Sequence, residues 1–325
     1  MEQTWLSTNT FHHSEFSDLE KLVVAKQNKG VKISLCLPTL NEEQTIAKQI
    51  VIMRSELVDR FPLLDEIIVI DSGSSDKTRD IAAHYEADVY LASDILPELE
   101  PYKGKGENLW KAIHIANGDI IVYLDTDIKN IHHRFAYALI GPLLLFDKIR
   151  FTKAFYDRPL ADGDAGIRPT GGGRVTELVI RPLFSLFFPE LTQIIQPLSG
   201  EYAGYRDLFE KLPFPIGYAI ETSMIIDIYE KWGLEVMAQV DLDRRVHRNQ
   251  TTRQLGKMSF AIMQRFLRRI EDYHLIDLKA DLFDQMIQFK HQTDGYQQEI
   301  YSFQKQERPP MVTIDSYKKK FAGNN

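Results

Sequence analysis

The sequence of 325 residues contains a single cysteine and no long hydrophobic run. Because Cys36 is alone, an intrachain disulfide is excluded and a reducing compartment is the expected location. The longest apolar run, ALIGPLLLF, is interrupted by Gly141 and Pro142 and is shorter than the ~18 residues that a membrane-spanning helix needs. The first residues, MEQTWLSTNTFHHSEF, lack the basic start and apolar core of a signal peptide. We therefore expect a cytoplasmic protein without a membrane span.

Positive charge is also scarce. The 39 Lys and Arg residues are outnumbered by 46 Asp and Glu residues, which gives a formal net charge of -7. This balance argues against nucleic acid as the main partner, and a small anionic substrate would need a local basic pocket. The chain is 44% hydrophobic and 26% charged, as is typical of globular proteins. Its length allows one extended domain or a catalytic domain with an appended lobe.

The common glycine-rich nucleotide loops are missing. The stretch KGKGENL supplies Gly104 and Gly106, but the third glycine position of a G-x-G-x-x-G motif is Leu109. No G-x-x-x-x-G-K-[ST] motif occurs anywhere in the sequence. These absences argue against a dehydrogenase and against a P-loop nucleotide hydrolase.

The first half contains a regular alternation of short apolar runs and helical patterns. We expect strands at 32–38, 65–71, 87–92 and 118–125, separated by helices at 42–57, 77–85 and 106–117. Such an alternation indicates a mostly parallel sheet that is covered on both faces. Ligands of these sheets bind at the carboxyl ends of the strands. Three polar clusters follow strands there: residues 41–43, 71–76 and 125–127.

The second half is less regular. Residues 157–174 form a loop rich in Gly, Pro and Asp, long enough to suggest a functional segment. Helical patterns follow up to Pro189 and over 217–233, with a strand pattern over 234–242. From about residue 251 to residue 306 the pattern is mainly helical, and the last ten residues read as a mobile tail.

Asp125 and Asp127 raise a question of charge. In an extended chain their spacing puts both carboxylates on one face, about 7 Å apart. A turn after a buried strand would explain an isolated pair. A cation site would explain why two like charges are held together, since they raise each other's pKa unless neutralised. The convergence of three polar clusters favours the cation site.

Four motifs in order resemble the nucleotide-sugar glycosyltransferases of the GT-A fold: LPTLNEE, VIDSGSSDKT, KGKGENLWKA and YLDTDI. The later stretches GGGRVTEL, QPLSGEYAG, FPIGYAIE and VHRN more specifically resemble glucosyl-3-phosphoglycerate synthases and their mannosyl relatives, which are retaining enzymes. The resemblance covers about residues 30–270. It implies an α/β GT-A fold with a mainly helical C-terminal extension. The expected organisation is an N-terminal extension (1–30), a catalytic domain (31–250) with a nucleotide-sugar half (31–130) and an acceptor half (151–250), a helical part (251–315) and a mobile tail (316–325).

The resemblance also implies a reaction, in which glucose passes from an NDP-glucose, with UDP-glucose favoured, to the 2-hydroxyl of D-3-phosphoglycerate. Asp127 and His247 would hold Mg²⁺, with Mn²⁺ or Co²⁺ also accepted, and the metal would stabilise the departing diphosphate. The implied catalytic residues are Asp127, Asp125 and Glu221, with Glu221 positioning sugar hydroxyls during front-face substitution. The implied donor-binding residues are Pro38, Leu40, Glu42, Ser72, Lys105, Asp125, Thr126 and Leu198.

The acceptor half is expected to contain an anion cradle. GGGRVTEL places three glycines before a helix start, where free N–H groups and the helix dipole favour a phosphate. Arg174 can add a bidentate contact. By the resemblance, phosphoglycerate is held by Gly173, Arg174, Val175, Thr176 and Asn249, and the chain forms a homodimer.

The sequence departs from the family in one place. Some relatives carry an arginine after VHRN that can touch the diphosphate, whereas this chain has Gln250. Arg244, Arg248 or Arg253 are candidates to replace that charge.

Three alternatives stay open at the level of sequence. The first is a mannosyl-3-phosphoglycerate synthase that uses GDP-mannose. The second is an inverting GT-A enzyme acting on a polyprenyl phosphate, for which RQLGKMSFAIMQRFLRRI is the candidate membrane-binding element. The third is a non-catalytic regulator that binds a nucleotide-sugar.

Overall fold

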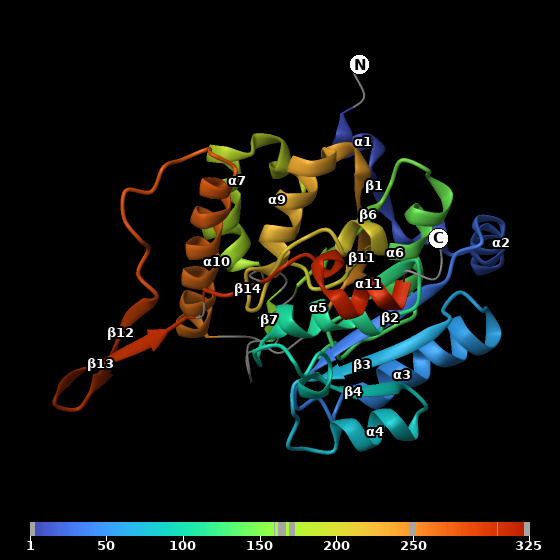
Figure 1. The fold of residues 1–325 in the computed structure, drawn as a ribbon, viewed down its shortest axis with the longest axis horizontal. Coiled ribbons are helices and arrows are strands. Elements are labelled where there is room, and N and C mark those ends of the chain that lie inside the picture. The colour runs from blue at the N-terminus through green and yellow to red at the C-terminus, as the bar shows by residue number, and fades with distance from the viewer. Residues whose placement is uncertain are drawn as a thin grey trace.

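The computed structural model describes residues 4–158, 160–161, 167–168, 173–246, 251–303 and 305–321. Its centre is an eight-stranded sheet in the order β1-β11-β6-β9-β5-β2-β3-β4 (Figure 1). All strands of this sheet run parallel except β9, which is antiparallel to both β5 and β6. The predicted mostly parallel sheet is therefore confirmed.

The strands of this sheet are β1 (Thr10–His12), β2 (Ile33–Thr39), β3 (Glu66–Asp71), β4 (Asp88–Leu91), β5 (Ile120–Tyr123), β6 (Phe151–Asp157), β9 (Tyr202–Tyr205) and β11 (Met237–Arg244). Three two-stranded pairs add β7 (Leu160–Ala161) with β8 (Ile167–Arg168), β10 (Phe214–Pro215) with β14 (Glu307–Arg308), and β12 (Gln285–Gln292) with β13 (Gly295–Ser302).

The α-helices are α1 (Trp5–Thr8), α2 (Leu19–Lys29), α3 (Ile46–Arg54), α4 (Thr78–His84), α5 (Lys105–Ile115), α6 (Arg134–Leu145), α7 (Arg181–Phe187), α8 (Arg206–Phe209), α9 (Ile220–Trp232), α10 (Thr252–Asp272) and α11 (Asp315–Phe321). Shorter 3-10 helices are η1 (His13–Phe16), η3 (Ala92–Asp94), η6 (Pro189–Gln193), η7 (Leu234–Val236) and η8 (Met311–Thr313). Two π-helical segments, η2 (Ser55–Arg60) and η5 (Thr176–Ile180), continue α3 and precede α7.

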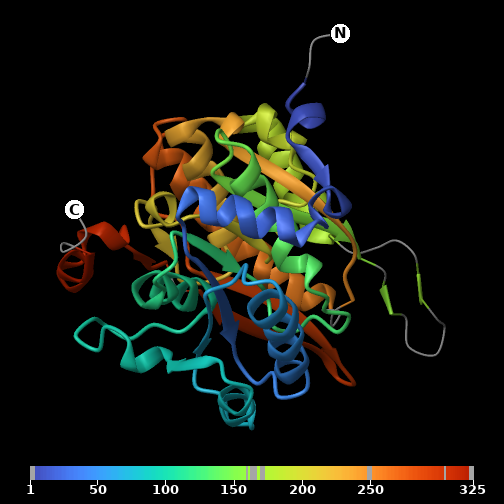
Figure 2. The same ribbon diagram turned by 90° about the vertical axis from the view of Figure 1, so that its right-hand side faces the viewer.

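Alternate side chains of the central strands enter two separate cores. Leu35 and Leu37 of β2 pack with α2, α3 and α6, whereas Cys36 between them faces a second core built on α5, α7, α9 and α10. Ile121 and Val122 of β5 divide in the same way. This period of two is what an extended strand buried on both sides requires. Figure 2 shows helices on both sides of the sheet.

The carboxyl ends of β2, β3 and β5 converge, as the sequence predicts. The hydroxyl of Thr39 donates to Asp71 Oδ2 at 3.2 Å, which joins the ends of β2 and β3. The Thr126 hydroxyl donates to the Pro38 carbonyl at 3.0 Å, which joins the loop after β5 to β2. Gln49 of α3 donates to the carbonyl of Asp125 at 3.1 Å. The polar clusters thus share one edge of the sheet.

At both ends of the chain the structure adds elements that the sequence does not predict, while the predicted helical C-terminal region is present as α10 and α11. The N-terminal residues expected to form an extension supply β1, which pairs with β11, and helix α2, whose Leu22 is buried. At the other end, α10 is the predicted helix, but residues 285–302 form a hairpin that projects from the body (Figure 1). Residues 315–321 form α11 with Tyr317 buried, so this part of the expected mobile tail is an ordered helix.

The candidate membrane-binding element forms α10, and its apolar stripe is covered by the protein. Phe266 lies among Phe184, Phe187 and Phe188, with ring centroids 5.7 to 6.4 Å away. Ile262 and Ile270 on the same helix are fully buried. Among the described residues, no helix is both long and apolar enough to span a bilayer.

Candidate active site

Two basic side chains hold the aspartates that follow β5. Lys105 Nζ lies 2.6 Å from Asp125 Oδ1, and Arg245 Nη2 lies 3.1 Å from Asp125 Oδ2. The same Nη2 lies 2.7 Å from Asp127 Oδ1. Lys105 also reaches Glu221 Oε1 at 2.7 Å. The structure therefore brings the predicted residues Asp125, Asp127, Lys105 and Glu221 into one chain of ion pairs, with Arg245 as an additional member.

Lys105 is fixed by the tight start of α5. A Cβ on Gly104 would lie 2.1 Å from the carbonyl oxygen of Ile216, and one on Gly106 would lie 1.8 Å from that of Pro215. The Gly106 N–H donates to the Ile216 carbonyl at 3.1 Å. Only glycine permits such an approach of two backbones. The KGKG stretch thus lets α5 pack closely against β10. The helix begins at Lys105, one residue before the predicted start.

Burial and charge act in opposite directions on the pair at the centre of this chain. Burial by itself would lower the pKa of Lys105, but the carboxylates of Asp125 and Glu221 outweigh it and the pKa is raised. For Asp125 burial would raise the pKa, yet Lys105 and Arg245 outweigh it and the pKa is lowered. Both groups are therefore charged at neutral pH, as expected for opposite charges in contact.

Arg245 sits in a buried network behind the two aspartates. Its Nε lies 3.2 Å from Glu201 Oε1 as an ion pair, and its Nη1 donates to the Tyr156 hydroxyl at 3.3 Å. That hydroxyl donates in turn to Glu201 Oε2 at 2.5 Å and accepts from Arg158 Nη2 at 2.9 Å. Burial raises the pKa of Glu201, and the charge of Arg245 opposes this rise. The network orients the guanidinium toward Asp125 and Asp127.

The turn before β9 lies against the Asp125 side chain. A Cβ on Gly200 would lie 2.1 Å from Asp125 Oδ2, so this position is closed to any side chain. Lys153 Nζ donates to the Ser199 carbonyl at 2.7 Å and lies 4.6 Å from the centre of the Tyr202 ring. Burial lowers the pKa of Lys153 to about 7, with Glu221 opposing and Lys105 adding to the effect. The neighbouring Leu198, a predicted donor residue, is half-buried.

The predicted nucleoside-binding residues lie on the loops after β2 and β3. Asn108 of α5 donates to the Ser72 hydroxyl at 2.7 Å and so ties that loop to the helix that carries Lys105. Glu42 accepts from the Thr45 hydroxyl at 3.1 Å, and Leu40 is exposed. Pro38, Leu40, Glu42 and Ser72 therefore share the sheet edge that carries Thr126.

The predicted acceptor residues form a second group, where η5 begins. Gly173 has φ of 79°, a left-handed value that suits glycine, and its carbonyl accepts from Glu177 N–H at 3.0 Å. Arg174 is half-buried, and its Nη1 lies 3.4 Å from the Thr252 hydroxyl at the start of α10. Val175 and Thr176 are buried. His247 and Asn249, together with Gln250 and Arg248, lie outside the described residues.

Sequence reasoning missed Arg245 and chose other arginines to replace the charge absent at Gln250. Arg244 is exposed, and Arg253 pairs with Glu299 of the hairpin at 2.6 Å. Neither of these two described candidates pairs with the aspartates, whereas their neighbour Arg245 pairs with both. A candidate signal is the Arg-Arg pair at the end of β11, which follows a register shift between Asp241 and Arg244 and in which Arg244 is exposed and Arg245 buried. Lys153, Glu201 and Gln49 were also missed, because each sits within an ordinary strand, turn or helix pattern.

The residues present fit a divalent cation. Asp127 is the more exposed of the two aspartates, with 38% of its side chain accessible against 25% for Asp125. It follows β5, beside loops predicted to bind the nucleoside of the donor, and it supplies the hard oxygen ligand that Mg²⁺ and Mn²⁺ prefer. Arg245 offsets the charge of Asp127, and Lys105 offsets that of the neighbouring Asp125.

Comparison with known proteins agrees with this geometry. The glycosyl transferase family 2 profile matches residues 34–135. The glucosyl-3-phosphoglycerate synthase of Petrotoga mobilis is 54% identical over 316 residues, which cover 96% of each chain. A crystal structure of mannosyl-3-phosphoglycerate synthase from Rubrobacter xylanophilus superposes with a TM-score of 0.87 at 34% identity, covering 95% of this chain and 97% of that one.

A second solved structure carries ligands. It is the glucosyl-3-phosphoglycerate synthase of Mycobacterium tuberculosis in complex with Mn²⁺, UDP and glucosyl-3-phosphoglycerate. It superposes with a TM-score of 0.81 at 39% identity and covers 94% of this chain and 99% of that one. With more than half of its residues identical to the Petrotoga enzyme along nearly the whole length of both, this chain belongs to the glucosyl-3-phosphoglycerate synthase family.

Proposed function

We propose that this protein transfers glucose from UDP-glucose to the 2-hydroxyl of D-3-phosphoglycerate and gives glucosyl-3-phosphoglycerate. The observation that carries the proposal is the ion-pair chain of Lys105, Asp125, Arg245 and Asp127 at the end of β5. In this chain the cationic side chains of Lys105 and Arg245, which suit a diphosphate, lie next to two carboxylates. Asp127 would bind the metal, and Asp125 would face the sugar. The full-length similarity to the Petrotoga enzyme favours glucose over mannose.

The cation in this proposal is divalent, in line with the Mn²⁺ bound by the Mycobacterium tuberculosis relative. We propose Mg²⁺ as the working ion, held by Asp127 and His247, with Mn²⁺ and Co²⁺ accepted because imidazole suits those ions better. When bound, the ion stabilises the negative charge that the departing diphosphate gains. Arg245 and Lys105 can add positive charge on the same side, because both already reach this edge of the sheet.

Front-face substitution fits the carboxylates of the site. In the described part of the chain, Asp125, Asp127, Glu201 and Glu221 each lie within 3.2 Å of a lysine or arginine nitrogen. A carboxylate held in this way is a poor nucleophile, so a donor phosphate oxygen takes the acceptor proton and Glu221 positions sugar hydroxyls. The parent protein incubated with UDP-glucose should therefore show no trapped glycosyl-enzyme, and mass spectrometric detection of that adduct would contradict this mechanism.

The acceptor phosphate is assigned to the start of η5. Gly173 and Arg174 precede a helical segment whose first N–H groups point back along the chain, and this arrangement favours an anion. Val175, Thr176 and Asn249 complete the proposed acceptor group. An acidic protein with one local cradle suits a small anionic metabolite better than a polymer or a lipid.

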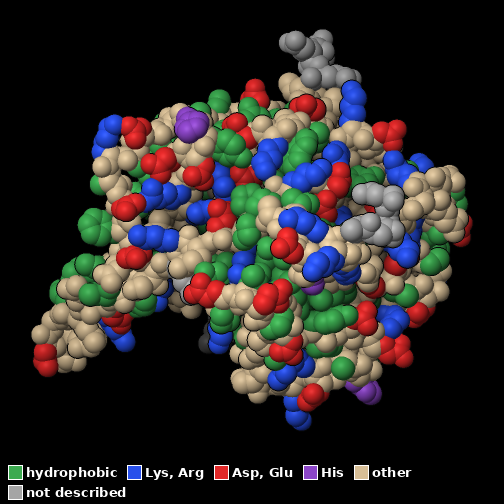
Figure 3. All heavy atoms as spheres, in the orientation of Figure 1, with side chains coloured by type: hydrophobic (Ala, Val, Ile, Leu, Met, Phe, Trp, Pro, Cys, Tyr) green, Lys and Arg blue, Asp and Glu red, His purple; other side chains and the backbone are tan. Residues whose placement is uncertain are grey.

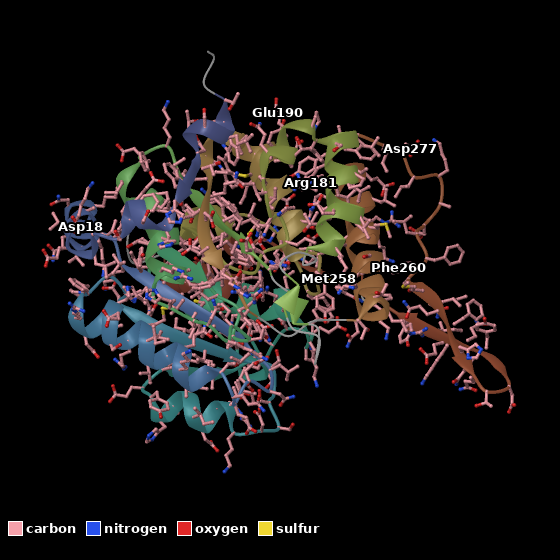
Figure 4. All side chains as sticks on the ribbon, turned by 180° about the vertical axis from the view of Figure 1, so that it is seen from behind. Asp18, Arg181, Glu190, Met258, Phe260 and Asp277 are labelled. Carbon is pink, nitrogen blue, oxygen red and sulfur yellow. The ribbon has the colours of Figure 1, made fainter. Side chains whose placement is uncertain are left out.

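We also propose a homodimer in which the projecting hairpin contacts a second copy. One face of the hairpin packs on α10, where Lys257 lies 3.3 Å from the centre of the Tyr301 ring. Figure 4 shows Met258 and Phe260 on α10 near the base of the hairpin, and the Phe260 ring lies 5.0 Å from that of Phe303. The opposite face carries the exposed side chains of Ile287, Phe289, Tyr296 and Ile300.

The decisive experiment measures nucleotide release. The protein is incubated with UDP-glucose, GDP-glucose or GDP-mannose, with and without D-3-phosphoglycerate and with Mg²⁺ or EDTA. We expect the fastest phosphoglycerate-dependent release from UDP-glucose, lost on chelation. Faster turnover with GDP-mannose would favour the mannosyl alternative. No acceptor-dependent turnover with any donor would overturn the proposal.

Cytoplasmic location remains a prediction, motivated by the free and fully buried thiol of Cys36. Cell fractionation with compartment markers tests it, and recovery of the chain outside the cytoplasmic fraction would contradict it.

A further inference from the structure

A second group of metal-ligating side chains lies away from the active site, where the N-terminal segment meets the end of β11. His12 closes β1, His13 opens η1, and Asp243 belongs to β11. His12 Nε2 lies 3.0 Å from Asp243 Oδ1, and His13 Nε2 lies 2.7 Å from Asp243 Oδ2. All three ligand atoms lie within 4.8 Å of one another. We propose that this cluster is a zinc site that fastens β1 to β11.

The far nitrogen of each imidazole has a hydroxyl neighbour. His12 Nδ1 lies 2.7 Å from the Ser14 hydroxyl, and His13 Nδ1 lies 3.3 Å from the Tyr137 hydroxyl. If each hydroxyl oxygen accepts a proton from Nδ1, both rings take the tautomer whose Nε2 lone pair points at Asp243. Protein zinc ligands are held by outer partners of this kind. Ser14 N–H also approaches His12 Nδ1 at 3.3 Å, and this long contact is lost in that tautomer.

Two imidazoles and one carboxylate match the donor set that zinc takes. Zn–N and Zn–O bonds of about 2.1 Å place neighbouring ligands of a tetrahedral ion roughly 3.4 Å apart. The separations from Asp243 are slightly shorter than this, so only a small opening of the cluster admits the ion. Water completes the coordination, since His12 and Asp243 are both close to half exposed. This donor set is richer in nitrogen than the proposed Asp127 site and therefore favours Zn²⁺ over Mg²⁺.

The local charge also suits a dication. Arg134 Nη1 lies 3.8 Å from Asp243 Oδ2 and opposes cation binding. Asp241, whose carboxylate accepts the Asp243 N–H at 2.9 Å, and Glu15, whose carboxylate accepts the His12 N–H at 2.7 Å, offset that charge. Asp243 itself has φ of 64°, a left-handed value that is uncommon outside glycine. This conformation turns its carboxylate toward the two histidines at the point where β11 leaves the sheet.

The consequence is structural. β1 is an edge strand held to β11 by only three register pairs, ending at His12 with Asp241. A metal bound by His12, His13 and Asp243 would close the strand pair at its carboxyl end, just before the chain turns to Arg245. The bound state should therefore be more resistant to unfolding, because a ligand specific to the folded state stabilises it.

The test counts zinc in the full-length protein. Metal-free protein carrying Asp127→Ala, which removes the proposed donor-site ligand, is titrated with Zn²⁺ by calorimetry, and Tm is recorded with and without the ion. We expect one equivalent and a rise in Tm of a few degrees. Adding His12→Ala and His13→Ala should abolish the bound equivalent of Zn²⁺ and the rise in Tm. His84→Ala, which changes an exposed histidine on α4, should leave the stoichiometry and the rise in Tm unchanged.

Tyr137→Phe keeps all three ligands and should weaken Zn²⁺ binding by about tenfold through loss of the outer partner. Asp243→Asn provides a third variant should the double histidine variant fail to fold. Equal Zn²⁺ affinity and stoichiometry in the His12, His13 and Asp243 variants and in the His84 control would overturn the proposal. Because the readout is metal binding, this outcome does not depend on whether the chain transfers glucose.

Discussion

At the scale of single residues, Asp127 is the side chain on which donor chemistry is expected to depend most. Asp127→Ala would remove the proposed metal ligand, while Arg245 would keep its ion pairs with Asp125 and Glu201. We expect kcat to fall at least ~100-fold, the scale of losing a major stabiliser of transition-state charge. Asp147→Ala, which removes an exposed carboxylate paired with Lys29, should leave steady-state turnover unchanged. A similar small effect for both substitutions would contradict the assignment.

Arg174 is expected to act on the acceptor alone. Arg174→Ala removes a guanidinium next to Gly173 without touching the ion-pair chain of the donor site. The KM for D-3-phosphoglycerate should rise by at least ~10-fold, as expected for a lost charge-assisted contact of about 1.5–3 kcal/mol. The KM for UDP-glucose should change little. Arg181→Ala, at the start of α7, is the matched control. An unchanged KM for D-3-phosphoglycerate in Arg174→Ala would contradict the proposed acceptor site.

Lys153 gives the ligand-free protein a pH-dependent stability. Because burial lowers its pKa to about 7, the folded chain releases this proton below the ~10.4 of an unfolded lysine. Between about pH 7 and pH 10 the unfolded state binds more protons, so the free energy of unfolding rises with pH. The contribution of this group is at most ~1.4 kcal/mol per pH unit, and below pH 7 its destabilising effect is fully present.

Urea denaturation from pH 7 to pH 9 measures this dependence. Lys153→Met should show a smaller rise in the free energy of unfolding than the parent, and Lys21→Met, an exposed lysine on α2, should follow the parent. Parallel curves for the parent and Lys153→Met would contradict the lowered pKa.

At the scale of elements, the position of α5 depends on the C-terminal segment. Glu107, two residues after Lys105, is fully buried. Its carboxylate accepts from Arg308 Nε and Nη2 at 2.7 and 2.8 Å, and Lys111 Nζ lies 3.1 Å away. The Arg308 guanidinium also lies 5.1 Å from the Trp110 ring centre. β14 therefore holds the helix that presents Lys105 to the site.

Arg308→Ala should lower the free energy of unfolding by about 3 kcal/mol, because it leaves a buried carboxylate with one of its two cations. Urea denaturation measures the loss. Arg60→Ala, which breaks an exposed pair with Glu56 on η2, should cost less than about 1 kcal/mol. Equal losses in the two variants would show that the buried pair does not brace α5.

At the scale of the whole molecule, the hairpin presents one apolar face that the described residues leave exposed. Phe289, Ile300 and Tyr296 on one face are 60%, 55% and 75% exposed, and Figure 3 shows hydrophobic side chains gathered near the base of the projection. An exposed apolar face of this kind marks an interaction site. A second copy is the simplest partner, because its own hairpin offers the same apolar face.

Substituting Phe289→Asp and Ile300→Asp together should convert the dimer to a monomer, since two charges would be buried without partners at the interface. Analytical ultracentrifugation measures the mass. Lys290→Asp, on the opposite face of the same strand, should leave the mass unchanged. A monomer in the parent protein, or a dimer in the double variant, would contradict the arrangement.

The strands of the nucleotide-sugar half can be predicted from the sequence. Buried parallel strands are continuous Val, Ile and Leu runs, so β2, β3 and β5 were found from local pattern alone. Because the carboxyl ends of such strands meet, the approach of Asp125 to the loops after β2 and β3 followed from topology. The C-terminal hairpin is not predicted from the sequence, since its exposed strands β12 and β13 lack the continuous Val, Ile and Leu runs of the buried strands.

What the sequence determined by itself was the fold class, the family and the residue types of the donor site, because strand periodicity and short motifs are local properties. What only the tertiary structure decided was which charges meet. Arg245, rather than Arg244 or Arg253, reaches Asp125 and Asp127, and it does so just beyond a register shift near the end of β11. His12 and His13 meet Asp243 because β1 pairs with that same strand across about 230 residues of chain. Contacts between distant segments depend on packing, and no local pattern encodes them.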